Sequence, residues 1–191
     1  MKKLLNWEET WKLTEAVNGL VTEAEMKLVF ETIRAEGDKV KLAVELGCLF
    51  GRSTTAILNA LDLSTKLYTV DNFAVQGSDT RDYFVENLVK KNVGKLSLLD
   101  MPAHEAAVSY GHHWKDGIDF IFIDADHQDH SIKEDCEDWL SKLNPGGVVA
   151  FHDYYNDQFP SVATRVEEFT QVWHVIGKAD SLMIKRRPYA V

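Results

Sequence analysis

The chain has 191 residues, of which 45% are hydrophobic and 27% charged, and its formal net charge at pH 7 is -9. This composition is typical of a globular domain and excludes a disordered or fibrous chain. The acidic balance argues against nucleic acid as a partner, because phosphate binding requires clustered Lys and Arg. Nothing in the sequence approaches the roughly 20 apolar residues that span a bilayer, and Cys48 and Cys136 lack metal-ligand spacing. We therefore expect a cytoplasmic protein without membrane contact, with a single domain over residues 1–191.

Residues 1–38 are expected to form a helical N-terminal extension. Thr22 and Glu25 have the spacing of a capping box, so a helix is predicted over 22–36, ending at Gly37. A shorter helix is expected over 6–18, where Trp7 and Trp11 lie one turn apart. Three roles remain open for this Trp pair: packing against the domain, covering a substrate, or forming a homodimer contact.

From residue 39 to 187, short apolar strands alternate with helices. This alternation predicts an α/β fold with a doubly wound, mostly parallel seven-stranded sheet, that is, a Rossmann-like core. The last two strands are joined by only four residues (177–180), so they must pair as an antiparallel C-terminal hairpin. Residues 144–147, Asn-Pro-Gly-Gly, are expected to form a turn. The expected strands cover 40–46, 66–70, 95–99, 118–123, 148–151, 173–176 and 182–185. The expected helices cover 52–61, 79–90, 103–110, 129–143 and 161–170.

A glycine-containing segment, Glu45–Ser53, joins the first core strand to its helix. Glycines let the backbone approach a ligand closely, and the N-terminus of the following helix offers free N–H groups. A dinucleotide fingerprint would require glycine at position 49, which is Leu. A P-loop would require four residues between its glycines and then Lys, whereas here there are three residues and then Arg52. The remaining pattern, acidic-x-Gly-x-x-x-Gly, resembles the first motif of class I methyltransferases, although a strand-to-helix turn also uses glycines for structural reasons.

Asp71 ends the second core strand, where a carboxylate is suited to accept two hydrogen bonds from a ribose diol. The alternative is that Asp71 caps a turn or helix. The segment Met101–Glu105 resembles the region that frames adenine in this family, which implies that Met101 and Ala103 contact the cofactor.

Three later motifs occur in a specific order, Phe122–His127, Asn144–Gly147 and Phe151–Tyr154. Together they resemble the metal-dependent O-methyltransferases, including the catechol type. They are nearer to the branch that contains sugar and macrolide O-methyltransferases and cephalosporin-hydroxylase-like proteins. This resemblance covers residues 40–187 and implies methyl transfer from S-adenosylmethionine to a hydroxyl of a small molecule.

The resemblance also implies roles for individual residues. His127 would be the general base, and Asp124 would bind both the cofactor and a divalent cation, Mg or Mn. His152 and Asp153 would complete the metal site, although the family usually has a carboxylate at the position of His152. An imidazole there suits manganese, iron or zinc better than magnesium, or it orients Asp153 without touching the metal. The complete set expected to bind the cofactor is Glu45, Gly47, Gly51, Ser53, Asp71, Met101, Ala103 and Asp124.

Two other functions remain open on the sequence alone. One is a non-catalytic module that keeps the cofactor fold for binding or assembly. The other is a nucleotide-dependent oxidoreductase with a related sheet, against which the missing third glycine counts. The pocket for the methyl acceptor is expected to come from the N-terminal helices, from the loops after Asp71 and Asp153, or from a second subunit.

Overall fold

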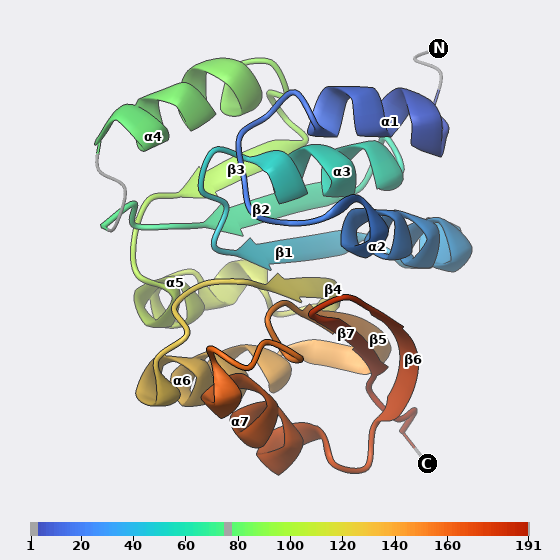
Figure 1. The fold of residues 1–191 in the computed structure, drawn as a ribbon, viewed down its shortest axis with the longest axis vertical. Coiled ribbons are helices and arrows are strands. Elements are labelled where there is room, and N and C mark those ends of the chain that lie inside the picture. The colour runs from blue at the N-terminus through green and yellow to red at the C-terminus, as the bar shows by residue number, and fades with distance from the viewer. Residues whose placement is uncertain (1–3, 75–77, 191) are drawn as a thin grey trace.

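A computed structural model describes residues 4–74 and 78–190 and contains one seven-stranded sheet (Figure 1). The strand order is β3-β2-β1-β4-β5-β7-β6, in which β1 to β5 pair in parallel and β7 pairs antiparallel with both β5 and β6. The predicted mostly parallel sheet with an antiparallel C-terminal hairpin is therefore confirmed. The strands are β1 (Leu42–Leu46), β2 (Lys66–Val70), β3 (Leu96–Leu99), β4 (Ile118–Ile123), β5 (Leu143–Phe151), β6 (His174–Ala179) and β7 (Leu182–Arg186).

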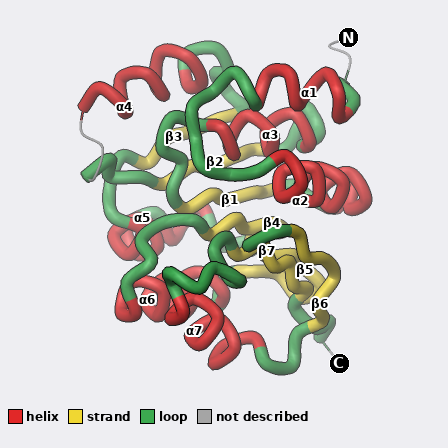
Figure 2. Tube along the Cα trace, in the orientation of Figure 1, coloured by secondary structure: helices red, strands yellow, loops and turns green. Residues whose placement is uncertain are grey.

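Helices cover both faces of the sheet, as Figure 2 shows. Alternate residues of β4 point to opposite faces: Phe120 and Phe122 pack into the core beneath α1 to α4, whereas Ile121 and Ile123 pack beneath α5 to α7. This alternation explains why β4 is almost continuously apolar, because both of its faces are buried. The helices are α1 (Trp7–Thr14), α2 (Glu23–Glu36), α3 (Arg52–Ala60), α4 (Ser78–Phe84), α5 (Ala103–Ser109), α6 (Asp129–Leu140) and α7 (Pro160–Thr170).

The N-terminal extension consists of α1 and α2, and each helix begins with a capping box. The predicted pair at α2 is present: the Thr22 hydroxyl accepts from the Glu25 backbone N–H at 3.2 Å, and the Glu25 carboxylate accepts from the Thr22 N–H at 2.8 Å. Trp7 is buried; its ring stacks on Trp11 at 5.6 Å and contacts the tilted ring of Phe30 at 5.4 Å. The Trp pair therefore packs α1 against α2, which supports the first of its three roles.

One local expectation was wrong. Residues 144–147 lie inside β5, because α6 ends at Leu140 and β5 begins at Leu143, which pairs with Ile118. The Gly146 N–H donates to the Arg187 carbonyl at 3.0 Å, so this glycine-rich run is held by the C-terminal segment rather than released as a turn. The helix expected over 79–90 is present: α4 continues after Phe84 into a π-helical turn over residues 85–89 (η2).

No helix in the described parts of the chain is long and apolar enough to cross a membrane. The single domain over residues 1–191, the cytoplasmic location and the homodimer remain predictions.

Candidate functional site

A cavity of about 940 Å³ lies at the carboxyl ends of the central strands. It spans the ends of β1 and β4, where the strand order reverses, which is the position at which open parallel sheets bind ligands. Its walls come from the glycine loop after β1, the segments that follow β2 to β5, the β6–β7 turn and the α1–α2 linker. The loop after Asp71 also contributes, although its residues 75–77 lie outside the described residues.

Gly47 brings the glycine loop into close contact with the end of β4. Its φ is +79°, and a Cβ built on it would lie 2.0 Å from the Asp124 carbonyl oxygen, so no other residue fits without displacing backbone. Gly51 has a different reason to be glycine. A Cβ at Gly51 would meet the Leu88 side chain at 1.9 Å, and Gly51 is not part of the cavity wall within the described chain.

Glu45 lies beneath the glycine loop and is not among the described residues that line the cavity. Its two carboxyl oxygens accept hydrogen bonds from the hydroxyls of Ser53 and Thr54, both at 2.6 Å. Burial raises the pKa of Glu45 to about 8, against the opposing effect of those two hydrogen bonds, so this carboxyl is mostly protonated at pH 7. Ser53 lines the cavity but directs its hydroxyl proton to Glu45, so the structure gives that hydroxyl a partner inside the protein instead of a ligand.

Asp71 clamps the glycine loop with its carboxylate. One oxygen accepts from the backbone N–H groups of Cys48 and Leu49 at 2.9 and 3.0 Å, and the other accepts from the N–H of Phe73 at 2.8 Å. The alternative role as a turn cap is thus present in the structure. A carboxylate has about four acceptor positions, so one position remains for a ligand in the cavity that Asp71 lines. Met101 and Ala103 line the same cavity at the start of α5.

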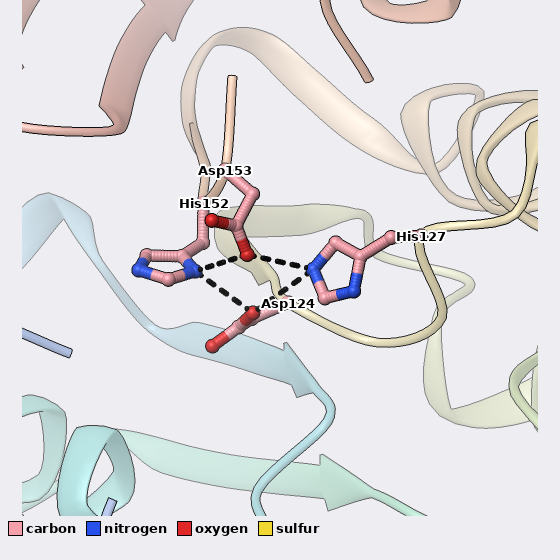
Figure 3. A group of neighbouring side chains, drawn as sticks. All are labelled: Asp124, His127, His152 and Asp153. Carbon is pink, nitrogen blue, oxygen red and sulfur yellow. Dashed lines mark hydrogen bonds and ion pairs between the residues drawn. The ribbon is translucent and has the colours of Figure 1, made fainter. Parts of the chain in front are cut away.

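The four residues predicted for catalysis and metal binding lie together at the other side of the cavity (Figure 3). Asp124 follows β4, His127 lies in the β4–α6 loop, and His152 and Asp153 follow β5. Asp153 Oδ2 lies 2.8 Å from His127 Nε2 and 3.0 Å from His152 Nδ1. Asp124 Oδ1 lies 3.0 Å from His152 Nδ1 and 3.7 Å from His127 Nε2. Two nitrogens and two oxygens therefore alternate around a ring.

Neighbouring side chains fix this ring. Asp153 has a φ of +56°, uncommon for a residue with a Cβ, and its Oδ1 accepts from the Asn156 amide at 2.7 Å, which leaves Oδ2 to face the imidazoles. Phe159 stacks on the His127 ring at 4.3 Å. The carboxylates of Asp124 and Asp153 raise the pKa of His127 to about 9. Although burial opposes the charged form of Asp153, its imidazole and amide partners hold the pKa of that carboxyl well below its usual value.

The ring fits a divalent cation. His127 Nε2 is buried and, although only 2.8 Å from Asp153 Oδ2, it has no hydrogen-bond partner among the described residues, because the two atoms are not aligned for one. The four donor atoms lie within 4.8 Å of one another. An imidazole beside two carboxylates suits manganese, iron or zinc better than magnesium, which prefers oxygen.

Sequence reasoning missed Glu25, Arg52, Asn156 and Phe159 as parts of the site, although all four line the cavity. Glu25 already had a sufficient explanation as the second member of a capping box. No local pattern could show that its carboxylate also lies 3.3 Å from His152, a residue 127 positions away.

Comparison with known proteins identifies the class of this fold and site. A family model described as a methyltransferase domain matches residues 44–154, more than half of the chain, so the chain belongs to this family. It is a class I methyltransferase domain of the type that uses S-adenosylmethionine, which confirms the resemblance found in the sequence motifs.

Similar solved structures include an O-methyltransferase from Bacillus cereus in complex with SAH, which has 18% identity and a TM-score of 0.71 over 95% of this chain and 90% of that one. A putative caffeoyl-CoA O-methyltransferase from Staphylococcus aureus has 17% identity and a TM-score of 0.71 over 96% and 92%. CalS11, a TDP-rhamnose 3'-O-methyltransferase of calicheamicin biosynthesis, has 13% identity and a TM-score of 0.68 over 94% and 92%. At these identities the likeness establishes the fold.

One curated relative, the uncharacterized protein y4gI of Sinorhizobium fredii (strain NBRC 101917 / NGR234), is 30% identical over 120 residues. The match covers 58% of this chain but only 13% of the relative, so the chain spans a small part of that protein's length.

Proposed function

We propose that this protein transfers the methyl group of S-adenosylmethionine to a hydroxyl of a small molecule. A single observation carries the proposal: one cavity joins the glycine loop and Asp71 to the ring of Asp124, His127, His152 and Asp153. A cofactor held at the first group would therefore present its methyl toward the second. The fold that this chain shares with several O-methyltransferases supports the transfer to oxygen.

The cofactor would lie along the ends of β1, β2 and β4. Gly47 leaves room for it, Asp71 has an acceptor position for the ribose, and Met101 and Ala103 would frame the adenine. Asp124 would contact the methionine part. Glu45, Gly51 and Ser53 would act indirectly, by shaping the glycine loop from beneath. The SAH bound in the Bacillus cereus structure of the same fold supports S-adenosylmethionine as the cofactor.

The chemistry asks little of the protein, because the sulfonium methyl is already activated. The protein must align an acceptor oxygen with that methyl and remove the oxygen's proton. His127 is placed to take the proton, and Phe159 holds its ring. The carboxylates of Asp124 and Asp153 raise the pKa of His127 to about 9, so its imidazole could accept a proton only once a cation engages those two carboxylates and offsets their charge. Asp124, His152 and Asp153 would hold a divalent cation beside it. When bound, that cation would lower the pKa of the acceptor hydroxyl and help to orient it.

The acceptor would lie between the α1–α2 linker and the loop after β5. Asn18 to Thr22, Asn156, Gln158 and Phe159 form that part of the wall. The described part of this wall presents no basic groove, so a small molecule fits better than a nucleic acid.

Calorimetric titration with S-adenosylhomocysteine tests the cofactor assignment. Chelator-treated protein is expected to bind it, and Asp71→Ala is expected to abolish binding because it removes both the loop clamp and the ribose acceptor. The same titration with NADH is the control for the oxidoreductase alternative. Binding of NADH but not of S-adenosylhomocysteine, with or without Mg²⁺ or Mn²⁺, would overturn the proposal.

Substitution of His127 tests the catalytic assignment. His127→Ala is expected to lower turnover by about 10²- to 10⁴-fold, the usual contribution of a general base, and to leave S-adenosylhomocysteine affinity unchanged. Manganese affinity measured on the same variant separates a base from a ligand, since loss of a ligand would weaken metal binding at least tenfold. Unchanged turnover with intact cofactor binding would instead indicate a non-catalytic module.

A further inference from the structure

The two ring nitrogens of His152 face different groups. Nδ1 lies 3.0 Å from both Asp124 Oδ1 and Asp153 Oδ2, on the side of the candidate metal centre. Nε2 lies on the other side, 3.3 Å from Glu25 Oε2 and 3.4 Å from the Ser181 hydroxyl. The ring is only 7% exposed, so solvent does not compete for either nitrogen.

Glu25 is itself held in place. Its side chain is 1% exposed, and its Oε1 accepts from the Ser181 backbone N–H at 3.1 Å and from the Ser181 hydroxyl at 2.7 Å. Its Oε2 accepts from the Thr22 N–H at 2.8 Å, within the capping box of α2. The Thr22 hydroxyl in turn donates to Asp180 at 2.6 Å. The start of α2, the β6–β7 turn and the end of β5 therefore meet at this carboxylate.

We propose that Glu25 is the positioning residue that makes His152 a metal ligand. As an ionised carboxylate, Glu25 accepts a hydrogen bond from the Nε2–H group of His152 and thereby fixes the tautomer in which the lone pair of Nδ1 faces Asp124 and Asp153. The inference rests on the metal centre of the proposed function. It also explains how an imidazole can occupy position 152, where the family usually has a carboxylate. The negative charge is then on Glu25, which contacts His152 on the side away from the metal centre.

The arrangement has a consequence for metal choice. Imidazole nitrogen favours manganese, iron and zinc over magnesium, and a hydrogen-bonded carboxylate increases the basicity of the imidazole. Both Glu25 and Ser181 lie outside residues 44–154, which match the family model. The N-terminal helix α2 and the C-terminal hairpin therefore set a property of the metal centre.

The test compares Glu25→Gln with Glu23→Gln in chelator-treated full-length protein. Glutamine keeps the size of Glu25, whereas Glu23 is an exposed residue in the same first turn of α2. Mn²⁺ and Mg²⁺ affinities are measured by calorimetry. Glu25→Gln is expected to weaken Mn²⁺ binding by about 10- to 100-fold, typical for loss of a group that supports a ligand. The preference for Mn²⁺ over Mg²⁺ should shrink, while Glu23→Gln changes neither.

A second measurement does not depend on metal affinity. The ¹⁵N chemical shifts of the His152 ring at saturating Zn²⁺ are expected to show a proton on Nε2 and none on Nδ1 in the wild type. In Glu25→Gln the ring should lose that single form, because the glutamine amide presents either a donor or an acceptor to Nε2.

The outcomes separate this inference from the proposed function. Wild-type protein that binds S-adenosylhomocysteine but no divalent cation would overturn the metal centre and this inference, and would leave the methyltransferase assignment intact. If the Mn²⁺ affinities of wild type and Glu25→Gln agree within twofold, that result would overturn this inference alone. Equal losses in Glu25→Gln and Glu23→Gln would also overturn it, since they would reflect the stability of α2.

Discussion

At the scale of single residues, the buried carboxyl of Glu45 determines how the glycine loop responds to pH. Its oxygens accept from Ser53 and Thr54 at the start of α3, so it joins β1 to the helix that follows the loop. Burial raises its pKa from the ordinary value of 4.5 to about 8. Between these two values the folded protein keeps a proton that the unfolded chain has released. The contribution of Glu45 to stability is therefore full below pH 4.5 and is lost as the pH rises toward 8.

Glu45→Gln is expected to remove this pH dependence, because glutamine is neutral at every pH and keeps the same shape. The measurement is urea unfolding of wild type and variant at several pH values between 5 and 8. The free energy of unfolding of the wild type should fall relative to the variant by up to about 1.4 kcal/mol per pH unit, the value for one proton. Other groups titrate equally in both proteins, so only the difference is used. Parallel curves would show that Glu45 is charged in the folded protein.

Substitution of Gly47 and of Gly94 distinguishes the cost of backbone strain from the cost of a steric collision. Gly47 and Gly94 both have positive φ, at +79° and +85°, but a Cβ on Gly94 meets nothing within 4 Å. Gly94→Ala is therefore expected to cost only the strain of a left-handed residue, about 1–2 kcal/mol. Gly47→Ala adds a collision with the backbone of Asp124 and should cost more than Gly94→Ala, with loss of S-adenosylhomocysteine binding. Equal losses of stability, measured by urea unfolding, would argue against the close approach of the loop to β4.

At the scale of helices and strands, the sequence predicted those elements that a local residue pattern determines. The apolar run of β4 predicted a strand buried on both faces, and the Thr22–Glu25 spacing predicted the start of α2. The start of β5 could not be predicted, because Asn-Pro-Gly-Gly favours a turn unless another strand and the Arg187 backbone are there to pair with it. The order of motifs predicted that Asp124, His127, His152 and Asp153 share one site, and their side chains do lie together. The contacts of Glu25 with His152 and Ser181 could not be predicted, because they join residues far apart in the sequence.

The linker between α1 and α2 is an element whose position depends on one side chain. The Arg52 guanidinium donates to the Gly19 carbonyl at 3.0 Å and lies over the Trp11 ring at 5.3 Å. Arg52→Met is expected to weaken this tether by about 1 kcal/mol, the usual worth of one hydrogen bond. Amides of residues 18–21 should then exchange hydrogen roughly fivefold faster, as measured by mass spectrometry.

The matched control for the linker is Arg165→Met. Arg165 also tethers two segments, through ion pairs with Asp129 and Glu168 on the α6–α7 side, away from the linker. It should leave exchange at residues 18–21 unchanged. Faster exchange in both variants would point to general destabilisation, and no change in Arg52→Met would show that the packing of α1 holds the linker.

At the scale of the whole molecule, the net charge of -9 is concentrated where it affects binding. Among the described residues, the cavity wall contains eight acidic side chains, against one arginine, Arg52, and three histidines, His104, His127 and His152. Burial raises the pKa of one of the eight, Asp135, to about 7, so the acidic groups still outnumber the basic ones. A field of this sign attracts the cationic sulfonium of the cofactor and repels anions. The acidic residues are Glu25, Asp71, Asp124, Asp126, Glu134, Asp135, Asp153 and Asp180.

This field predicts the charge of the methyl acceptor. Between a neutral methyl glycoside and a nucleoside-diphosphate sugar with the same free hydroxyl, the neutral compound is expected to be the better acceptor, by at least tenfold in kcat/KM, or about 1.4 kcal/mol. The kcat/KM value for each acceptor is measured by methyl transfer from labelled S-adenosylmethionine. Raising the ionic strength should reduce the difference, because salt screens repulsion over distances of about 10 Å at 0.1 M. If the anionic acceptor is instead preferred, and most strongly at low salt, then basic residues outside the described wall, or from a second subunit, must complete the acceptor site.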